Sequence, residues 1–220
     1  MKLKTRKRLY EELEDLKSKT MKMGSLVAAA VEEAVESLVR RNVRLAKKVI
    51  KEDDKIDNLE LEIENKCMHI IALQQPVAKD LRLIGSCFKI ITDLERVGDR
   101  AVDIASLTIE FAGRPLVKPL VDIPRMAELA VGMLRDSMRA FKEEDSLLAQ
   151  GLGERDDEVD RLAHQVTREL FSYLIEDPKK ISDAVRLILV ASFLERIADH
   201  ATNIGERVIY VEKGKRVKIN

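Results

Sequence analysis

The sequence has no tryptophan and only two cysteines, and aromatic side chains make up 4% of its 220 residues. The few aromatic residues are not interleaved with the basic runs, so a base-stacking surface for nucleic acid is not expected. Cys67 and Cys87 form no C-x-x-C motif, which argues against a zinc knuckle and against a disulfide framework. Cysteine usage therefore favours a reducing compartment.

Neither sign of charge is in excess, because 39 basic residues balance 39 acidic ones. A chain of zero formal charge has no global basic field to attract nucleic acid or an anionic membrane. The most hydrophobic stretch, residues 185–194, is too short to cross a bilayer, and the basic start has no apolar segment behind it. We therefore expect a cytoplasmic protein without a nucleic-acid partner.

Proline and glycine divide the chain into helical segments. Charged residues make up 35% and hydrophobic residues 45% of the chain, which is typical of long amphipathic helices. Apolar residues recur at three- and four-residue spacings, and a run with three prolines between residues 115 and 124 cannot be helix interior. The pattern predicts six helices, at about residues 9–41, 43–74, 77–112, 124–142, 146–175 and 178–212, with Gly151 and Gly153 as weak points in the fifth.

The two halves of the chain repeat one another. The phrase LERVGD at residues 94–99 returns as LERIAD at residues 194–199, and the acidic quintet 53–57 returns as 156–160. Three amphipathic helices in each half can enclose a core, and the similarity of the halves suggests a pseudo-twofold arrangement. We predict an all-α fold of two similar antiparallel three-helix bundles, residues 1–113 and 124–220, joined by a linker at 114–123.

Each repeated phrase places a glutamate on the apolar side of its helix. At about 100° per residue, Glu95 shares a sector with Ile84, Phe88 and Ile91, and Glu195 lies in the corresponding sector of the last helix. Burying an unpaired carboxylate costs several kcal/mol, so each glutamate needs an arginine or a bound cation as a countercharge.

Further polar residues lie in a row on the same helix face as each glutamate, and similar rows lie on the neighbouring helices. The third helix carries Glu95, Asp99 and Asp103, the sixth Glu195, Asp199 and Asn203, the second Asp53, Asp57, Glu60 and Glu64, and the fifth Asp156, Asp160 and His164. Neighbouring helices would bring two acidic rows together, which is unfavourable unless positive charge lies between them. Oxygen ligands without thiolates suit Mg²⁺, Mn²⁺ or iron, and a dense acidic cluster can hold more than one ion.

The pattern leaves an alternative to metal open, because Arg96, Arg100 and Arg196 can neutralise the acids by salt bridges. The sequence has no Glu-x-x-His pair of the di-iron bundles, no glycine-rich phosphate loop and no serine elbow, so it does not indicate an enzyme. His200 is expected to be a surface neighbour of Asp199.

Three longer segments, Ala72–Arg82, Ile91–Asp99 and Leu194–Ile204, resemble the PhoU family of phosphate-uptake regulators, and the resemblance spans nearly the whole chain. It implies two three-helix bundles whose E/D-x-x-x-D motifs bind multinuclear metal clusters of divalent or trivalent ions, such as iron, manganese, magnesium or zinc. By that resemblance Asp53 and Asp57 pair with Glu95 and Asp99, and Asp156 and Asp160 pair with Glu195 and Asp199, with Asp103, Asn203, Glu60, Glu64 and His164 as further candidates.

The resemblance also implies a function. PhoU-family proteins are adaptors rather than enzymes, and they damp phosphate uptake and phosphate-starvation signalling. They do so through contact with the ATPase subunit of the phosphate ABC transporter and, in many bacteria, with a sensor histidine kinase. A homodimer that meets the membrane only through the transporter is expected on the same ground.

The sequence leaves open whether the two proposed sites are alike and which function they serve. Asn203 stands where the first half has Asp103, so the two metal sites can differ in charge. The competing hypotheses are a metal-dependent phosphohydrolase, in which clustered cations activate water, and a structural helical dimer without metal.

Overall fold

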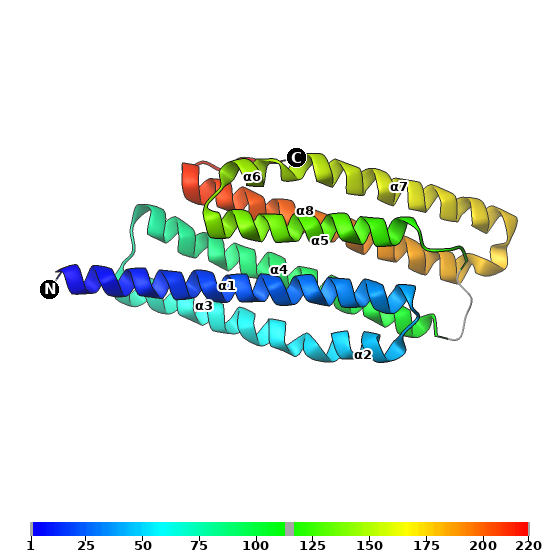
Figure 1. Cartoon of the computed structure of the whole chain (residues 1–220), viewed down its shortest axis with the longest axis horizontal. Helices are drawn as coiled ribbons and strands as arrows, with labels where there is room; N and C mark the ends of the chain where they lie inside the picture. The colour runs from blue at the N-terminus through cyan, green and yellow to red at the C-terminus, as the bar shows by residue number, and fades with distance from the viewer. Residues whose placement is uncertain (1, 113–116, 220) are drawn as a thin grey trace.

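A computed structural model describes residues 2–112 and 117–219, and these residues contain no β-strand. Figure 1 shows two bundles of long helices lying side by side. The first bundle consists of α1 (Lys2–Val39), α2 (Val43–Glu52), α3 (Asp54–Gln74) and α4 (Ala78–Glu110). The second consists of α5 (Asp122–Glu143), α6 (Ser146–Gln150), α7 (Leu152–Glu176), the 3₁₀ turn η1 (Pro178–Lys180) and α8 (Ile181–Lys213). The prediction of two three-helix bundles is confirmed, with α2–α3 and α6–α7 each serving as one interrupted helix.

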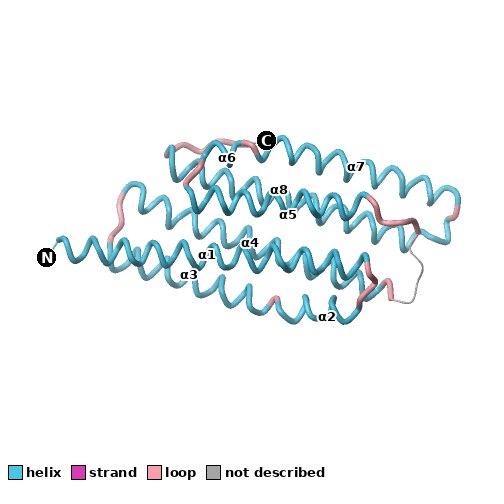
Figure 2. The backbone as a smooth tube through the Cα atoms, viewed as in Figure 1, coloured by secondary structure: helices cyan, strands magenta, loops and turns pink. Residues whose placement is uncertain are grey.

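The interruption between α2 and α3 falls at Asp53, where the sequence has neither proline nor glycine. Asp53 keeps helical backbone angles, and its carbonyl accepts from the amides of both Ile56 (2.7 Å) and Asp57 (3.2 Å). One tightened turn therefore separates the two helices. Figure 2 shows α2 and α3 following one another in the same direction along one edge of the bundle. The break between α6 and α7 falls at Gly151, as the sequence allowed.

Polar caps and left-handed residues define several helix ends. The Asn42 carboxamide accepts from two amides at the start of α2, and the Asp145 carboxylate does the same for α6. Asp177 caps the turn that precedes α8, as its position before a proline predicts, although that turn is 3₁₀ rather than α-helical. Gly214 ends α8 with a φ of 68°, a conformation that glycine adopts without strain.

The second bundle begins slightly earlier than predicted. Residues 113–116 lie outside the described part of the chain, and α5 already begins at Asp122, inside the expected linker 114–123. Pro124 then falls in the first turn of α5, where amide groups have no partner within the helix and a proline is tolerated. None of the helices in the described residues is both long and apolar enough to cross a membrane.

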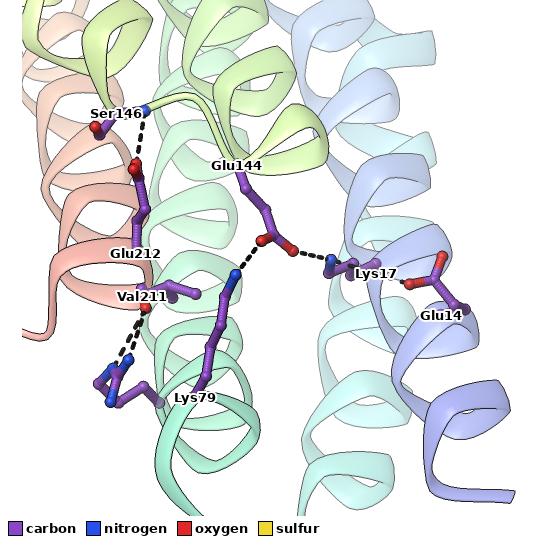
Figure 3. A network of polar contacts seen from close by, with 8 residues as sticks. Glu14, Lys17, Lys79, Glu144, Ser146, Val211 and Glu212 are labelled. Carbon is purple, nitrogen blue, oxygen red and sulfur yellow. Dashed lines mark hydrogen bonds and ion pairs between the residues drawn. The ribbon is translucent and has the colours of Figure 1, made fainter. Parts of the chain in front are cut away.

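The two bundles are in contact along their length, because α4 packs against α8 and α1 packs against α5. At one end of this interface the Glu144 carboxylate bonds to Lys17 of α1 and to Lys79 of α4, each at 2.5 Å (Figure 3). Glu212 of α8 accepts from the Ser146 amide nearby. Glu144 thus joins the second bundle to two helices of the first.

A pair of contacts between α4 and α8 shows the pseudo-twofold relation. The His200 Nδ1 atom lies 2.9 Å from a carboxylate oxygen of Asp93, and the Arg100 guanidinium lies 5.4 Å from the centre of the Phe193 ring. These residues are equivalents in the repeat, with Asp93 matching Phe193 and Arg100 matching His200. The prediction that His200 lies at the surface is therefore wrong, because its side chain is largely buried in the contact with Asp93, while its expected influence on Asp199 is present.

Candidate metal-binding site

In the first bundle the predicted acidic residues lie on two neighbouring elements. Asp57, Glu60 and Glu64 belong to α3, and Asp53 stands at its start. Glu95, Asp99 and Asp103 belong to α4, which packs directly against α3. Glu95 is partly buried beside the fully buried Leu94, so the apolar environment predicted for it is present only in part.

Asp53 has the most perturbed carboxylate of this group. Burial raises its pKa from 3.8 to about 6, and the charges of Asp57, Asp99 and Glu95 add to the effect. Gly98 on α4 makes room for it, because a methyl group built on Gly98 would lie 3.2 Å from an Asp53 carboxylate oxygen. The Asp53 carboxylate, at the junction before α3, thus approaches the α4 backbone closely, among other acids.

The remaining acids of the two helices influence one another across the same contact. Burial raises the pKa of Glu95, and Asp99 and Asp57 raise it further. The pKa of Glu60 is raised by burial and then by Glu95, and that of Asp57 by burial and then by Asp99. The two acidic rows predicted from the sequence therefore do face each other in the first bundle.

At one end of the acidic row on α4, an arginine neutralises the acid by a salt bridge, which is the predicted alternative to a metal ion. A guanidinium nitrogen of Arg100 lies 2.6 Å from a carboxylate oxygen of Asp103. Burial raises the pKa of Asp103, and Arg100 opposes that rise. Arg96 is exposed and forms no ion pair with a described residue, although Arg96 and Arg100 both oppose the rise in the pKa of Glu95.

The second bundle repeats the arrangement with different neighbours. Burial raises the pKa of Glu195 on α8, and so do Asp160 of α7 and Asp199, while His164 opposes them. The pKa of Asp199 is raised by burial and by Asp160, against the influence of His200 and Arg196. Asp160, Glu195 and Asp199 form no ion pair with any residue in the described ranges.

The two acidic clusters are not identical. Asp156, the repeat equivalent of Asp53, is only 2% exposed and lies within α7 rather than at a helix junction. Ala198 occupies the place of Gly98, so the second bundle lacks the open position beside the first aspartate. Asn203, partly buried on α8, replaces Asp103. The repeated phrase shows the change from Gly98 to Ala198, but only the structure shows that Gly98 lies beside Asp53.

The donor chemistry of both clusters suits hard cations, because carboxylates predominate and thiolates are absent. Within residues 2–112 and 117–219, however, no three His, Cys, Asp or Glu side chains are gathered closely enough to hold a metal ion. Asp57 and Asp99 are exposed, so their side chains are free to turn toward an ion between the helices. The acids Glu60 and Glu64 lie further along α3, and His164 is exposed on α7.

Together the fold and the sites define a class: an all-helical protein of two repeated three-helix bundles, each with acidic side chains facing one another across two helices. The PhoU domain model matches the chain twice, at residues 20–108 and 123–208. The chain belongs to the PhoU family.

Similar proteins cover almost the full length of the chain. A protein of Aquifex aeolicus named as a phosphate-specific transport system accessory protein PhoU homolog is 48% identical over 96% of both chains. The crystal structure of PhoU from Pseudomonas aeruginosa superposes with a TM-score of 0.90 at 38% identity, covering 94% of this chain and 99% of that one. A PhoU structure from Streptococcus pneumoniae gives a TM-score of 0.89 at 28% identity, with 96% and 99% covered.

Proposed function

We propose that this protein is a cytoplasmic, metal-binding regulator of phosphate uptake that acts by contact with other proteins. Membership of the PhoU family, whose relatives are named accessory proteins of the phosphate-specific transport system, supports the role in phosphate uptake. The observation that carries the metal-binding part is that Asp57 raises the pKa of Glu95, and Asp160 the pKa of Glu195, in each case from the neighbouring helix. Such facing carboxylates are stabilised when a cation shares them.

The ligands proposed for the first bundle are Asp53, Asp57, Glu95 and Asp99, with Glu60 and Glu64 close by. The ligands proposed for the second are Asp156, Asp160, Glu195 and Asp199, with Asn203 and His164 as neighbours. Asp103 is the weakest candidate, because Arg100 already pairs with it. A bound divalent or trivalent ion, iron, manganese, magnesium or zinc, would supply positive charge between the paired helices.

The proposed partner is the ATPase subunit of the phosphate ABC transporter, and a sensor histidine kinase is the second. A pull-down with the full chain as bait tests the contact. The bait is offered purified ATPase, and then extracts of phosphate-starved and of phosphate-replete cells. Retention of the ATPase that depends on phosphate supply is expected. Failure to retain it under either condition would contradict the proposed contact, and sedimentation of the purified chain as a monomer would contradict the proposed homodimer.

The chief alternative is a metal-dependent phosphohydrolase, in which the acidic cluster holds cations that activate water. The relatives give it little support, since they are named as accessory proteins of the phosphate-specific transport system. Phosphate-ester turnover by metal-loaded protein, lost in Glu95→Gln but kept in the exposed control Glu143→Gln, would establish the enzyme and overturn the adaptor.

A further inference from the structure

A second feature of the molecule, away from the acidic clusters, is a basic cavity between α4 and α8. It has a volume of about 460 Å³ and is lined by the cations Arg82, Lys89, Arg207 and Arg216 together with Ser86 and Tyr210. Among the residues that the structure describes, no acid lines it. Its volume falls in the range of small-molecule sites, which is about 300–1,000 Å³.

Two polar atoms at this cavity lack the partners that buried groups normally have. Ser86 is 2% exposed, and its hydroxyl oxygen forms no hydrogen bond with a described residue. The Nε atom of Arg207 is buried and likewise without a hydrogen bond in the described residues. An unsatisfied buried donor costs about 1–3 kcal/mol, so a ligand that accepts from both groups would recover that loss.

The four cations are also without acidic partners in the described residues, since none of them takes part in an ion pair. Arg82 donates from Nε and Nη2 to the Val211 carbonyl, which leaves its Nη1 without a hydrogen bond to a described residue. The nearest acids along α8 are engaged elsewhere, Glu206 by the Ile219 amide and Glu212 by the Ser146 amide.

The end of the chain helps to form this cavity. After Gly214 the chain turns back along α8, and Ile219 packs against the core while its amide donates to Glu206. This return places the Arg216 guanidinium 5.8 Å from the centre of the Tyr210 ring. A cation held on an aromatic ring at the rim is pre-positioned and does not need ordering when a ligand arrives.

The repeat offers an internal comparison. The equivalent place across the pseudo-twofold axis has Ser182, Arg186 and Leu189 where the cavity has Arg82, Ser86 and Lys89, and Leu107 where it has Arg207. There Arg186 is neutralised by Glu110 at 2.7 Å and Asp183 at 3.3 Å. The concentration of unpaired positive charge is therefore specific to the α4–α8 cavity and is not a by-product of the duplication.

We propose that this cavity binds a phosphoryl oxyanion, with Arg207, Lys89 and Ser86 as the donors that recognise it. Four positive charges match a multiply charged phosphorylated small molecule better than a singly charged anion, and arginine is suited to bidentate contact with phosphate oxygens. Free inorganic phosphate presents the same chemistry in a smaller volume. This site is independent of the proposed metal sites.

Isothermal titration calorimetry of the full chain in EDTA tests the proposal without bound metal. Inorganic phosphate, pyrophosphate and ATP are the probes, each titrated separately at low and at moderate salt. Binding of at least one is expected, weakening as salt rises, and Arg207→Gln and Lys89→Gln should each weaken it about tenfold. Tighter binding of inorganic phosphate identifies the free anion as the ligand, and tighter binding of pyrophosphate or ATP identifies a phosphorylated small molecule.

Arg186→Gln is the matched control, because it removes the same charge at the pseudo-symmetric place and should leave binding within about twofold of the native value. Arg216→Gln changes an exposed side chain at the rim of the cavity and should also weaken binding, which keeps the proposal testable if Arg207→Gln fails to fold. Absence of binding for all three probes would overturn the proposal, and so would equal losses in Arg207→Gln and Arg186→Gln.

Discussion

Replacing Asp53 by asparagine should stabilise the metal-free protein at neutral pH. The pKa of Asp53 is raised from 3.8 to about 6 by burial and by neighbouring acids, so its ionised form is disfavoured in the folded chain. The difference corresponds to about 3 kcal/mol at pH 7, at about 1.4 kcal/mol per pKa unit. Asp53 is only partly buried, and solvent screening reduces this value to about 1–2 kcal/mol.

The sign of the pH dependence follows from the raised pKa. The contribution of protonated Asp53 to stability is fully present below pH 3.8 and is lost as the pH rises through about 6. Asp53→Asn should therefore equal the native chain near pH 4 and exceed it at pH 7, where melting in EDTA should rise by about 2–8 °C. Asp54→Asn, which removes an exposed neighbouring charge, should shift melting much less.

Differential scanning calorimetry across this pH range, in EDTA, makes the comparison. With a saturating cation the order should invert, because the native chain gains stabilisation from a ligand that Asp53→Asn holds less tightly. Equal melting temperatures of native chain and variant at pH 7 in EDTA would refute the reasoning, since Asp53 would then be solvated or already paired.

Three further predictions concern other parts of the molecule. Glu95→Leu should raise the melting temperature in EDTA, because it removes a partly buried acid among like charges, and an unchanged or lower value would show the glutamate to be solvated. Lys17 and Lys79 lower the pKa of Glu144, so Glu144→Gln should cost about 1 kcal/mol in urea unfolding at pH 7 and less below pH 4.5, and a cost independent of pH would exclude an ionic bridge. Leu194→Ala should destabilise the chain by about 2–5 kcal/mol, and Leu189→Ala, at a 41% exposed position, by about 1 kcal/mol or less; similar losses would contradict the burial of Leu194.

The sequence predicts the helical architecture well because the apolar period and the prolines are local signals. These signals do not predict helix boundaries that other interactions determine. The α1 helix begins at Lys2 rather than near residue 9, and the ion pairs Lys7–Glu11 and Arg8–Glu12 lie along this early part of the helix. The break at Asp53 was not predicted, because no proline or glycine marks it.

The acidic rows were predictable for the same reason, since their four-residue spacing fixes one helix face. The contacts of the charged residues around these rows were not predictable. Arg100 turns to Asp103 and His200 to Asp93, and these choices depend on how the bundles pack. The basic cavity escaped the sequence reasoning as well, because Arg82 and Arg207 are far apart along the chain and meet only where α4 crosses α8.

The claim that each bundle binds cations through its own acidic pair of helices is tested most directly by counting bound metal. The chain is stripped with EDTA, dialysed separately against magnesium, manganese, iron or zinc, and analysed for metal per chain by mass spectrometry. Glu95→Gln with Asp99→Asn should abolish the metal of the first bundle only, and Glu195→Gln with Asp199→Asn that of the second only. No bound metal with any of these ions, or an unchanged metal content in both double variants, would contradict the claim.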